Sequence, residues 1–310
     1  MKRVFAVFVA AAPLLLAGGC GGSSADLSAR RAMAGAGAEA YPVTVGDLTI
    51  ARRPGRIVSL APTATEVLYA IGAGPQVVAV DDQSNYPTTA PLTDLSGAMP
   101  NAAAIAAKKP DLVVLADDRD KIVSRLGELK IPVLLTPAAT TMDDAYREIG
   151  QVGALTGHRA EAEALHLQMS ASINRIVKGV PTRRRPLSYY YELDPTLYTV
   201  TSRTFIGSIF SMFGMADVAD AADPTGVEGG YPKLSPDALI KSDPDVIFLA
   251  DDTCCGQSAQ TVGARQGWKT ITAVTLGHVF PLDDDIAARW GPRTVDFVQS
   301  IADALAKLPA

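Results

Sequence analysis

The chain has 310 residues, of which 48% are hydrophobic and 20% charged, a balance typical of globular proteins. A formal net charge of −5 and the lack of any basic stripe argue against a nucleic-acid partner. Beyond its N-terminal segment the sequence is long enough for two domains of ordinary size.

Residues 1–20 are typical of an export signal. Residues 1–3 are basic and residues 4–16 are apolar, a run too short to span a membrane as a helix. Cys20 follows small residues and resembles the lipobox of bacterial lipoproteins, which implies a lipid-modified Cys20; the alternative is a secreted protein that loses it. Residues 21–40 are rich in Gly, Ala and Ser and predict a flexible tether.

Residues 41–141 are expected to form a first α/β lobe. Short apolar strands alternate with helices, which implies a mainly parallel sheet. The strands are expected at 56–60, 76–80, 113–115 and 133–135, and the helices at 63–71 and 121–129. Thr63 is expected to cap the first helix, because Glu66 stands three residues later, the spacing of a capping box.

Residues 142–182 have almost no strand character and form a predicted linker region. Their apolar residues recur at helical spacing, and the second part predicts one long helix over 159–178. Gly153 and Gly157 are expected to interrupt the part before it. The long helix stands between two similar halves of the chain, so we expect it to join them.

Residues 183–310 are expected to form a second lobe like the first. Its strands are expected at 187–193, 246–249 and 279–282, and its helices at 205–213 and 294–308. Residues 110–118 and 244–252 repeat one pattern, Pro-Asp, an apolar run, then Leu-Ala-Asp-Asp. A repeat at one domain's spacing predicts two similar α/β lobes with a ligand cleft between them. At least one of the three consecutive tyrosines at 189–191 is expected in the core.

Cys254 and Cys255 are adjacent, and we expect them to form a vicinal disulfide, because disulfides persist in exported proteins. The alternative is two free thiols in a surface loop. A metal site is disfavoured because no histidine stands near them in sequence. Acidic pairs also follow several predicted strands, and we interpret them as helix caps and solvated loops, with no metal site.

The sequence resembles the periplasmic-binding family that captures cobalamin, ferric siderophores or haem for ABC importers. The resemblance covers about residues 55–308 and rests on four motifs: Arg-Ile-Val-Ser-Leu-Ala-Pro-Thr-Ala-Thr-Glu at 56–66, Ser-Asn-Tyr-Pro at 84–87, Lys-Pro-Asp-Leu-Val at 109–113, and Lys-Leu-Ser-Pro-Asp at 233–237. It implies two Rossmann-like lobes joined by a single long α-helix. It also implies a monomer, lipid-anchored to the outer face of the bacterial cytoplasmic membrane, that delivers its ligand to a permease and ATPase.

Binding residues are expected on loops that follow the strands, at their carboxyl ends. Flat aromatic faces can bury a large organic ligand, and arginines can pair with its carboxylate or phosphate groups. The candidate ligand-binding residues are Tyr86, Tyr198, Arg203, Tyr231, Arg289 and Trp290. Tyr86 also matches a cleft-lining position of the family.

Cobalamin is slightly favoured as the ligand, with a ferric siderophore or haem as alternatives. Haem needs an axial ligand, and the scarcity of histidine leaves Tyr86 or Tyr231 for that role. We expect no cofactor of the protein's own. An enzyme of unknown type is a weaker alternative, because the chain has no Gly-x-Ser-x-Gly, Walker or His-Glu-x-x-His motif.

Permease docking is expected to use one carboxylate on each lobe, as the resemblance implies. On the second lobe the match is Asp237, which follows a good N-cap at Ser235 and could instead serve only to stabilise its helix. On the first lobe the match is Ala103, which carries no charge.

Overall fold

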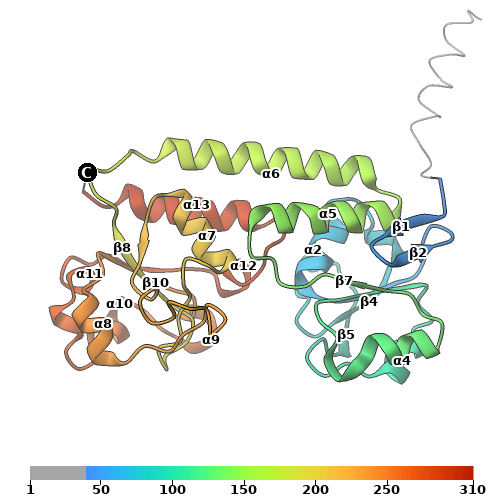
Figure 1. Ribbon diagram of the computed structural model, residues 1–310, viewed down its shortest axis with the longest axis horizontal. Coiled ribbons are helices and arrows are strands. Elements are labelled where there is room, and N and C mark those ends of the chain that lie inside the picture. Colours follow the sequence, from blue (N-terminus) through green and yellow to red (C-terminus); the bar gives the residue numbers. More distant parts are fainter. Residues whose placement is uncertain (1–39, 310) are drawn as a thin grey trace, which may run out of the picture. The chain divides into compact units, whose positions relative to one another are not determined.

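Two parallel sheets organise the computed structural model, which describes residues 40–309 (Figure 1). The expected signal, Cys20 and the tether lie outside the described residues. The sheet of the first lobe has the order β5-β4-β3-β6-β7, and that of the second lobe β11-β10-β8-β9. Every strand pair within these two sheets is parallel, which confirms the predicted α/β class.

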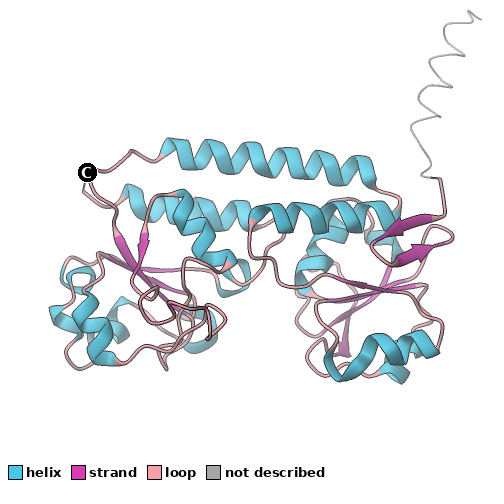
Figure 2. Ribbon diagram, viewed as in Figure 1, coloured by secondary structure: helices cyan, strands magenta, loops and turns pink. Residues whose placement is uncertain are grey.

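The first lobe is built around two fully buried strands, because helices cover its parallel sheet (Figure 2). Its strands are β3 (Ile57–Leu60), β4 (Val77–Asp81), β5 (Leu92–Leu95), β6 (Leu112–Leu115) and β7 (Val133–Leu135). Its helices are α2 (Pro62–Ala70), α3 (Ala102–Ala107) and α4 (Ile122–Glu128). A hairpin of β1 (Val43–Val45) and β2 (Leu48–Ile50) precedes the sheet; neither it nor β5 was expected from the sequence.

The predicted cap of the first helix is wrong. Helix α2 begins at Pro62 after Ala61, and no side chain caps it. Proline suits the first helical position because its fixed φ is already helical and its missing N–H has no partner there. Thr63 therefore lies inside the helix, and Glu66 is buried with a partner elsewhere.

Two helices form the linker region, α5 (Met142–Thr156) and α6 (Arg159–Gly179). Gly157 ends α5 with a left-handed φ of 76°, as expected of a C-terminal glycine. Gly153 does not interrupt α5; a Cβ there would lie 2.4 Å from Ala162, so glycine permits α5 and α6 to pack. The predicted long helix over 159–178 is confirmed, one residue longer. Figure 1 shows α6 running above both lobes, and it packs against α5 and against α13 (Thr294–Ala306).

The second lobe is centred on β8 (Ser188–Glu192), whose three tyrosines are all buried. Tyr189 and Tyr191 face Phe210, with ring centroids 4.2 and 5.9 Å away, while Tyr190 faces Trp268 on the opposite side of the sheet. The other elements are α7 (Phe205–Met212), β9 (Ala216–Asp217), α8 (Pro236–Ser242), β10 (Val246–Leu249), α9 (Asp252–Cys255), α10 (Ala259–Gly263), α11 (Thr272–Thr275), β11 (Val279–Pro281) and α12 (Asp284–Ala287). Within the described residues no helix is long and apolar enough to cross a membrane.

Candidate functional site at the carboxyl edges of the two sheets

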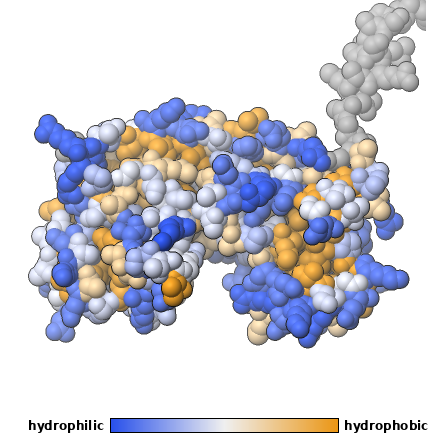
Figure 3. Space-filling model, in the orientation of Figure 1, coloured by the Kyte–Doolittle hydropathy of each residue, from blue (hydrophilic) through white to orange (hydrophobic). Residues whose placement is uncertain are grey.

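The loops that carry the candidate residues meet across the two lobes. Parallel strands place their carboxyl ends at one edge of a sheet, so the loops after β4 and after β11 each lie at such an edge. Asn85 Nδ2 donates to Asp285 Oδ2 at 2.6 Å, and Arg289 Nη2 donates to the Gln83 carbonyl at 3.0 Å. These bonds bring the two edges together. Figure 3 shows the surface hollowed into a notch between the two halves, below this contact.

Three candidate tyrosines on strand-end loops are exposed to solvent: Tyr86 after β4, Tyr198 after β8 and Tyr231 after β9. Tyr86, Tyr198 and Tyr231 are 47%, 44% and 43% exposed, whereas the tyrosines of β8 are at most 1% exposed. The Tyr86 and Tyr198 rings contact basic side chains, Arg293 and Lys233, yet almost half of each residue is open to solvent. These three rings are therefore available to a ligand.

On the second lobe, Tyr198 lies close to a basic side chain. Tyr198 forms an isolated antiparallel bridge with Lys233, whose Nζ lies 5.4 Å from the Tyr198 ring centroid. Arg203 is exposed and donates from Nη1 to the Pro224 carbonyl at 3.1 Å. Burial raises the pKa of the Tyr231 hydroxyl, which disfavours its ionised form.

Glu66, which the sequence reasoning did not identify as a site residue, is the centre of the contact between the lobes. Its Oε1 accepts hydrogen bonds from Arg289 Nη1 at 2.9 Å and from Arg293 Nη2 at 2.6 Å. The Glu66 side chain is 1% exposed. Its arginine partners are more than 200 residues away in sequence, so no local sequence pattern could predict these ion pairs.

Arg289 is only 7% exposed, and its donors are committed within the protein. Besides Glu66 and the Gln83 carbonyl, it pairs with Asp285 Oδ1 at 2.9 Å. Arg293 has its guanidinium carbon 4.4 Å from the Tyr86 ring centroid. Both arginines therefore hold the loops that would contact a ligand, and their charge is neutralised by protein carboxylates.

Trp290 packs against the main hydrophobic core and joins α12 to the linker region. Its indole Nε1 donates to Glu148 Oε2 on α5 at 2.9 Å. Burial raises the pKa of the Glu148 carboxyl to about 7, although the Trp290 bond acts in the opposite direction. Trp290 thus has a structural partner and does not stand free like the exposed tyrosines.

A second buried acidic group lies under α9. Glu192 is fully buried, and its two carboxylate oxygens accept hydrogen bonds from Arg265 Nη1 and Nη2, each at 2.6 Å. Asp251 is fully buried beside it, and its side-chain contact is with the Glu192 carboxylate, a pair that requires a shared proton. Burial, and next the neighbouring Glu192 charge, raise the pKa of Asp251 to about 7.

Helix α9 carries the disulfide between Cys254 and Cys255, which are both exposed. The Cys254 N–H donates to Asp284 Oδ2 at 2.7 Å, which ties α9 to α12. Asp283 caps α12 by accepting from the Ile286 N–H at 3.0 Å, a helix-cap role that was expected for the acidic pairs. Among residues 40–309 no group of three or more His, Cys, Asp or Glu could hold a metal ion.

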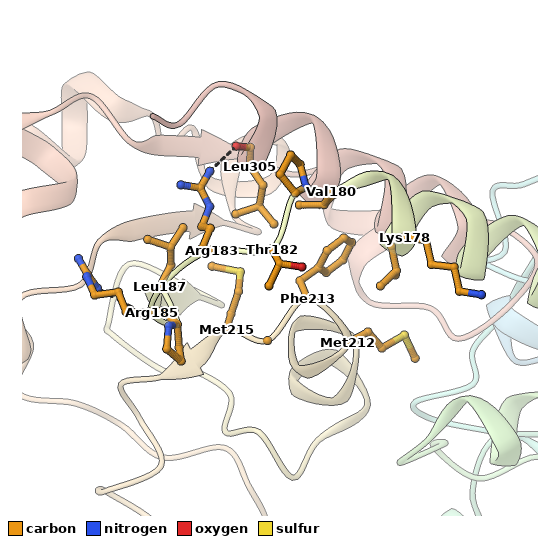
Figure 4. A pocket seen from close by; sticks show the side chains of 14 residues that line it. Lys178, Val180, Thr182, Arg183, Arg185, Leu187, Met212, Phe213, Met215 and Leu305 are labelled. Atoms are coloured by element: carbon orange, nitrogen blue, oxygen red, sulfur yellow. Dashed lines mark hydrogen bonds between the residues drawn. The ribbon is translucent and has the colours of Figure 1, made fainter. Parts of the chain in front are cut away.

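Two open cavities lie away from these loops, at the amino end of the second sheet. A cavity of about 500 Å³ is lined by the end of α6 and by Leu187, Phe213 and Met215 (Figure 4). A second, of about 810 Å³, shares the 181–187 segment with it. None of the candidate ligand residues lines either cavity, so neither defines the site.

The predicted docking residues lie on short helices. Asp237 is exposed in the first turn of α8, where Ser235 Oγ accepts from the Ala238 N–H at 3.1 Å and Pro236 occupies the first helical position. Ala103 is exposed near the start of α3.

Two parallel α/β sheets under one spanning helix, with their carboxyl edges apposed, are the architecture of a two-lobed binding protein. The sequence matches the model of the family described as periplasmic binding protein over residues 57–286, so the chain belongs to that family.

Relatives of known class extend over most of the chain. An uncharacterized ABC transporter substrate-binding lipoprotein of Bacillus subtilis is 29% identical and covers 86% of this chain and 86% of its own length. A cobalamin-binding protein of Halobacterium salinarum is also 29% identical, over 85% of this chain and 74% of its own. The crystal structure of a possible iron-binding, periplasmic solute-binding protein of Staphylococcus epidermidis shares the fold, with a TM-score of 0.71 at 23% identity, over 83% of this chain and all of that one.

Proposed function

We propose that this chain is the extracytoplasmic substrate-binding protein of an ABC importer and that it captures a large metal chelate. The favoured ligand is cobalamin or another corrinoid. Its family and the names of its curated relatives support this class of protein. Those relatives are named as binding proteins, which agrees with the lack of catalytic motifs in this sequence.

The ligand-facing set in this proposal is Tyr86, Tyr198, Tyr231 and Arg203. The three exposed rings offer flat faces to a macrocycle at small entropic cost. Arg289 and Trp290, which were also candidates, are structural in this proposal. Arg289 holds the first-lobe loop, and Trp290 anchors the loop between α12 and α13.

The observation that carries the choice of ligand is the neutralisation of the two arginines at the contact. Because Arg289 and Arg293 are paired with Glu66, they are not available to anionic groups on a ligand. Exposed acids follow four of the strands, β4, β6, β10 and β11: Asp82, Asp117, Asp118, Asp252 and Asp283. Although Arg203 is basic, these acids disfavour a polyanion and suit a chelate whose rim carries amides, as in a corrinoid.

Haem and anionic ferric siderophores are the alternatives in the same importer class. The histidines do not favour haem, because His158 bonds to Gln76 beside the linker and His278 precedes β11 at the opposite edge of the sheet. Tyr86 and Tyr231, the two expected axial ligands, are both exposed, so haem stays an alternative.

Absorption spectra test this choice. Purified mature protein would be mixed separately with cyanocobalamin, hemin and a ferric hydroxamate, then passed through a desalting column. We expect cyanocobalamin to co-elute at one per protein chain. Retention of hemin or the ferric hydroxamate, with cyanocobalamin lost, would contradict the proposed ligand and keep the importer class.

The proposal places the protein at the outer face of the cytoplasmic membrane through Cys20, as a monomer that docks on the permease. Cys20→Ala is expected to move the protein from the membrane to the soluble fraction with an unchanged unfolding curve. Fatty-acid labelling that persists in Cys20→Ala would rule out this anchor.

A further inference from the structure

One buried carboxylate, that of Glu66, supports the contact between the two lobes. Its Oε1 accepts from Arg289 Nη1 and from both Nε and Nη2 of Arg293, at 2.9, 3.1 and 2.6 Å. The Glu66 side chain is 1% exposed and the arginines 7% and 15%. Without Glu66, Arg293 would lose the carboxylate that it bonds to, and Arg289 would keep only Asp285. Both arginines therefore depend on Glu66 for their position.

Each arginine contacts the 83–86 loop at a different point. Arg289 donates to the Gln83 carbonyl, and its other partner, Asp285, accepts from Asn85. Arg293 lies over the Tyr86 ring at 4.4 Å, within the range of a cation–π contact. The loop belongs to the first lobe, where Thr65 Oγ1 lies 2.9 Å from Ser84 Oγ, but Arg289, Asp285 and Arg293 of the second lobe also hold it.

We propose that Glu66 is a positioning residue for ligand binding: it fixes Arg289 and Arg293, and these hold the Tyr86 ring in the orientation that meets the ligand. The inference rests on the proposed function, in which Tyr86 contacts the ligand. Glu66 itself is buried and makes no contact with the ligand. Its effect on binding must therefore pass through the loop.

A matched control exists in the second lobe. Glu192 is also a buried glutamate held by an arginine, Arg265, but its contacts stay within that lobe. Glu66→Gln and Glu192→Gln each remove one buried charge while keeping the size of the side chain. Only the first variant is expected to change the 83–86 loop.

Amide hydrogen exchange tests the placement of the loop without any ligand. The Ser84 N–H bonds to the Asp81 carbonyl and the Asn85 N–H to the Gln83 carbonyl, so both amides report on loop opening. We expect exchange at these amides to rise about tenfold in Glu66→Gln and to stay unchanged in Glu192→Gln. Equal exchange in wild type and Glu66→Gln would overturn the proposal.

A double-mutant cycle tests the link to the ligand, with cyanocobalamin as the probe. Glu66→Gln is expected to weaken binding about tenfold in the wild-type background and to have no further effect in Tyr86→Ala. Additive losses would show that Glu66 acts on the ligand by some route other than Tyr86, and would overturn the proposal.

A second variant covers the case in which Glu66→Gln does not fold. Arg293→Lys keeps the positive charge but removes the planar group that stacks on Tyr86, and it enters the same cycle with the same expectation. If wild-type protein does not bind cyanocobalamin, the proposed ligand is wrong, and the exchange experiment alone decides the role of Glu66.

Discussion

The two copies of the repeated pattern end in opposite environments. After β6, Asp117 is exposed and pairs with Arg119, and Asp118 accepts from the Val123 N–H at 2.8 Å. After β10, the residue equivalent to Asp117 is Asp251, which is fully buried beside the Glu192 carboxylate.

The neighbouring strand explains this difference. Leu115 of β6 stands opposite Leu60 of β3, whereas Leu249 of β10 stands opposite Glu192 of β8. Glu192 brings a buried charge and its partner Arg265 to the end of the second sheet. A local sequence pattern therefore predicts the strand, but the adjoining strand decides the environment of the charges that follow it.

The largest expected effect contrasts the two arginines at these strand ends. Arg265→Ala would leave Glu192 buried without its counter-charge, and we expect a loss of about 3–5 kcal/mol in the free energy of unfolding. Arg119→Ala removes an exposed pair and should cost less than about 1 kcal/mol. Urea unfolding measures both. Equal losses of unfolding free energy in the two variants would contradict the contrast between a buried ion pair after β10 and an exposed one after β6.

The next effect is a pH dependence specific to the second copy. The pKa of Asp251 is about 7 in the folded protein, against an ordinary value near 4, so the folded state binds the extra proton. The contribution of Asp251 to stability therefore falls as the pH rises from about 4 to above 7. Glu148 and Asp217, whose pKa values burial also raises to about 7, act in the same direction.

Asp251→Asn isolates this contribution. We expect the variant to gain on the order of 2 kcal/mol over wild type at pH 8 and to show no gain at pH 4. Asp117→Asn is the matched control and should show no such pH-dependent difference. Thermal or urea unfolding across this range gives the answer. A constant difference between Asp251→Asn and wild type would count against a buried proton at Asp251.

A smaller effect, confined to transport, tests whether Asp237 on the second lobe docks on the permease. Asp237→Lys is expected to leave the affinity for cyanocobalamin unchanged and to lower uptake in cells, because like charges would meet at the permease. Lys241→Asp, on the same helix α8, controls for a change of charge alone. Normal uptake by Asp237→Lys, with the protein folded at wild-type level, would show that Asp237 serves only its helix.

The main strands and the long linker helix could be predicted because their apolar runs are continuous and their turns carry glycine or proline. The hairpin of β1 and β2, strand β5 and the short helices α9 to α12 could not, because these short segments have no continuous apolar run and depend on tertiary contacts. The exposed tyrosines follow from the rule that ligands bind at the carboxyl ends of parallel strands. Glu66 was mistaken for half of a capping box, because its arginine partners are distant in sequence.

The central claim is that the exposed tyrosines at the apposed strand ends bind the transported chelate. Isothermal titration of wild type and Tyr86→Ala with cyanocobalamin tests it most directly. We expect one site per wild-type chain and a loss of about 1–3 kcal/mol of binding free energy in Tyr86→Ala, because the variant lacks the exposed aromatic ring that the ligand would cover. Equal affinity of the two proteins for cyanocobalamin would contradict the account.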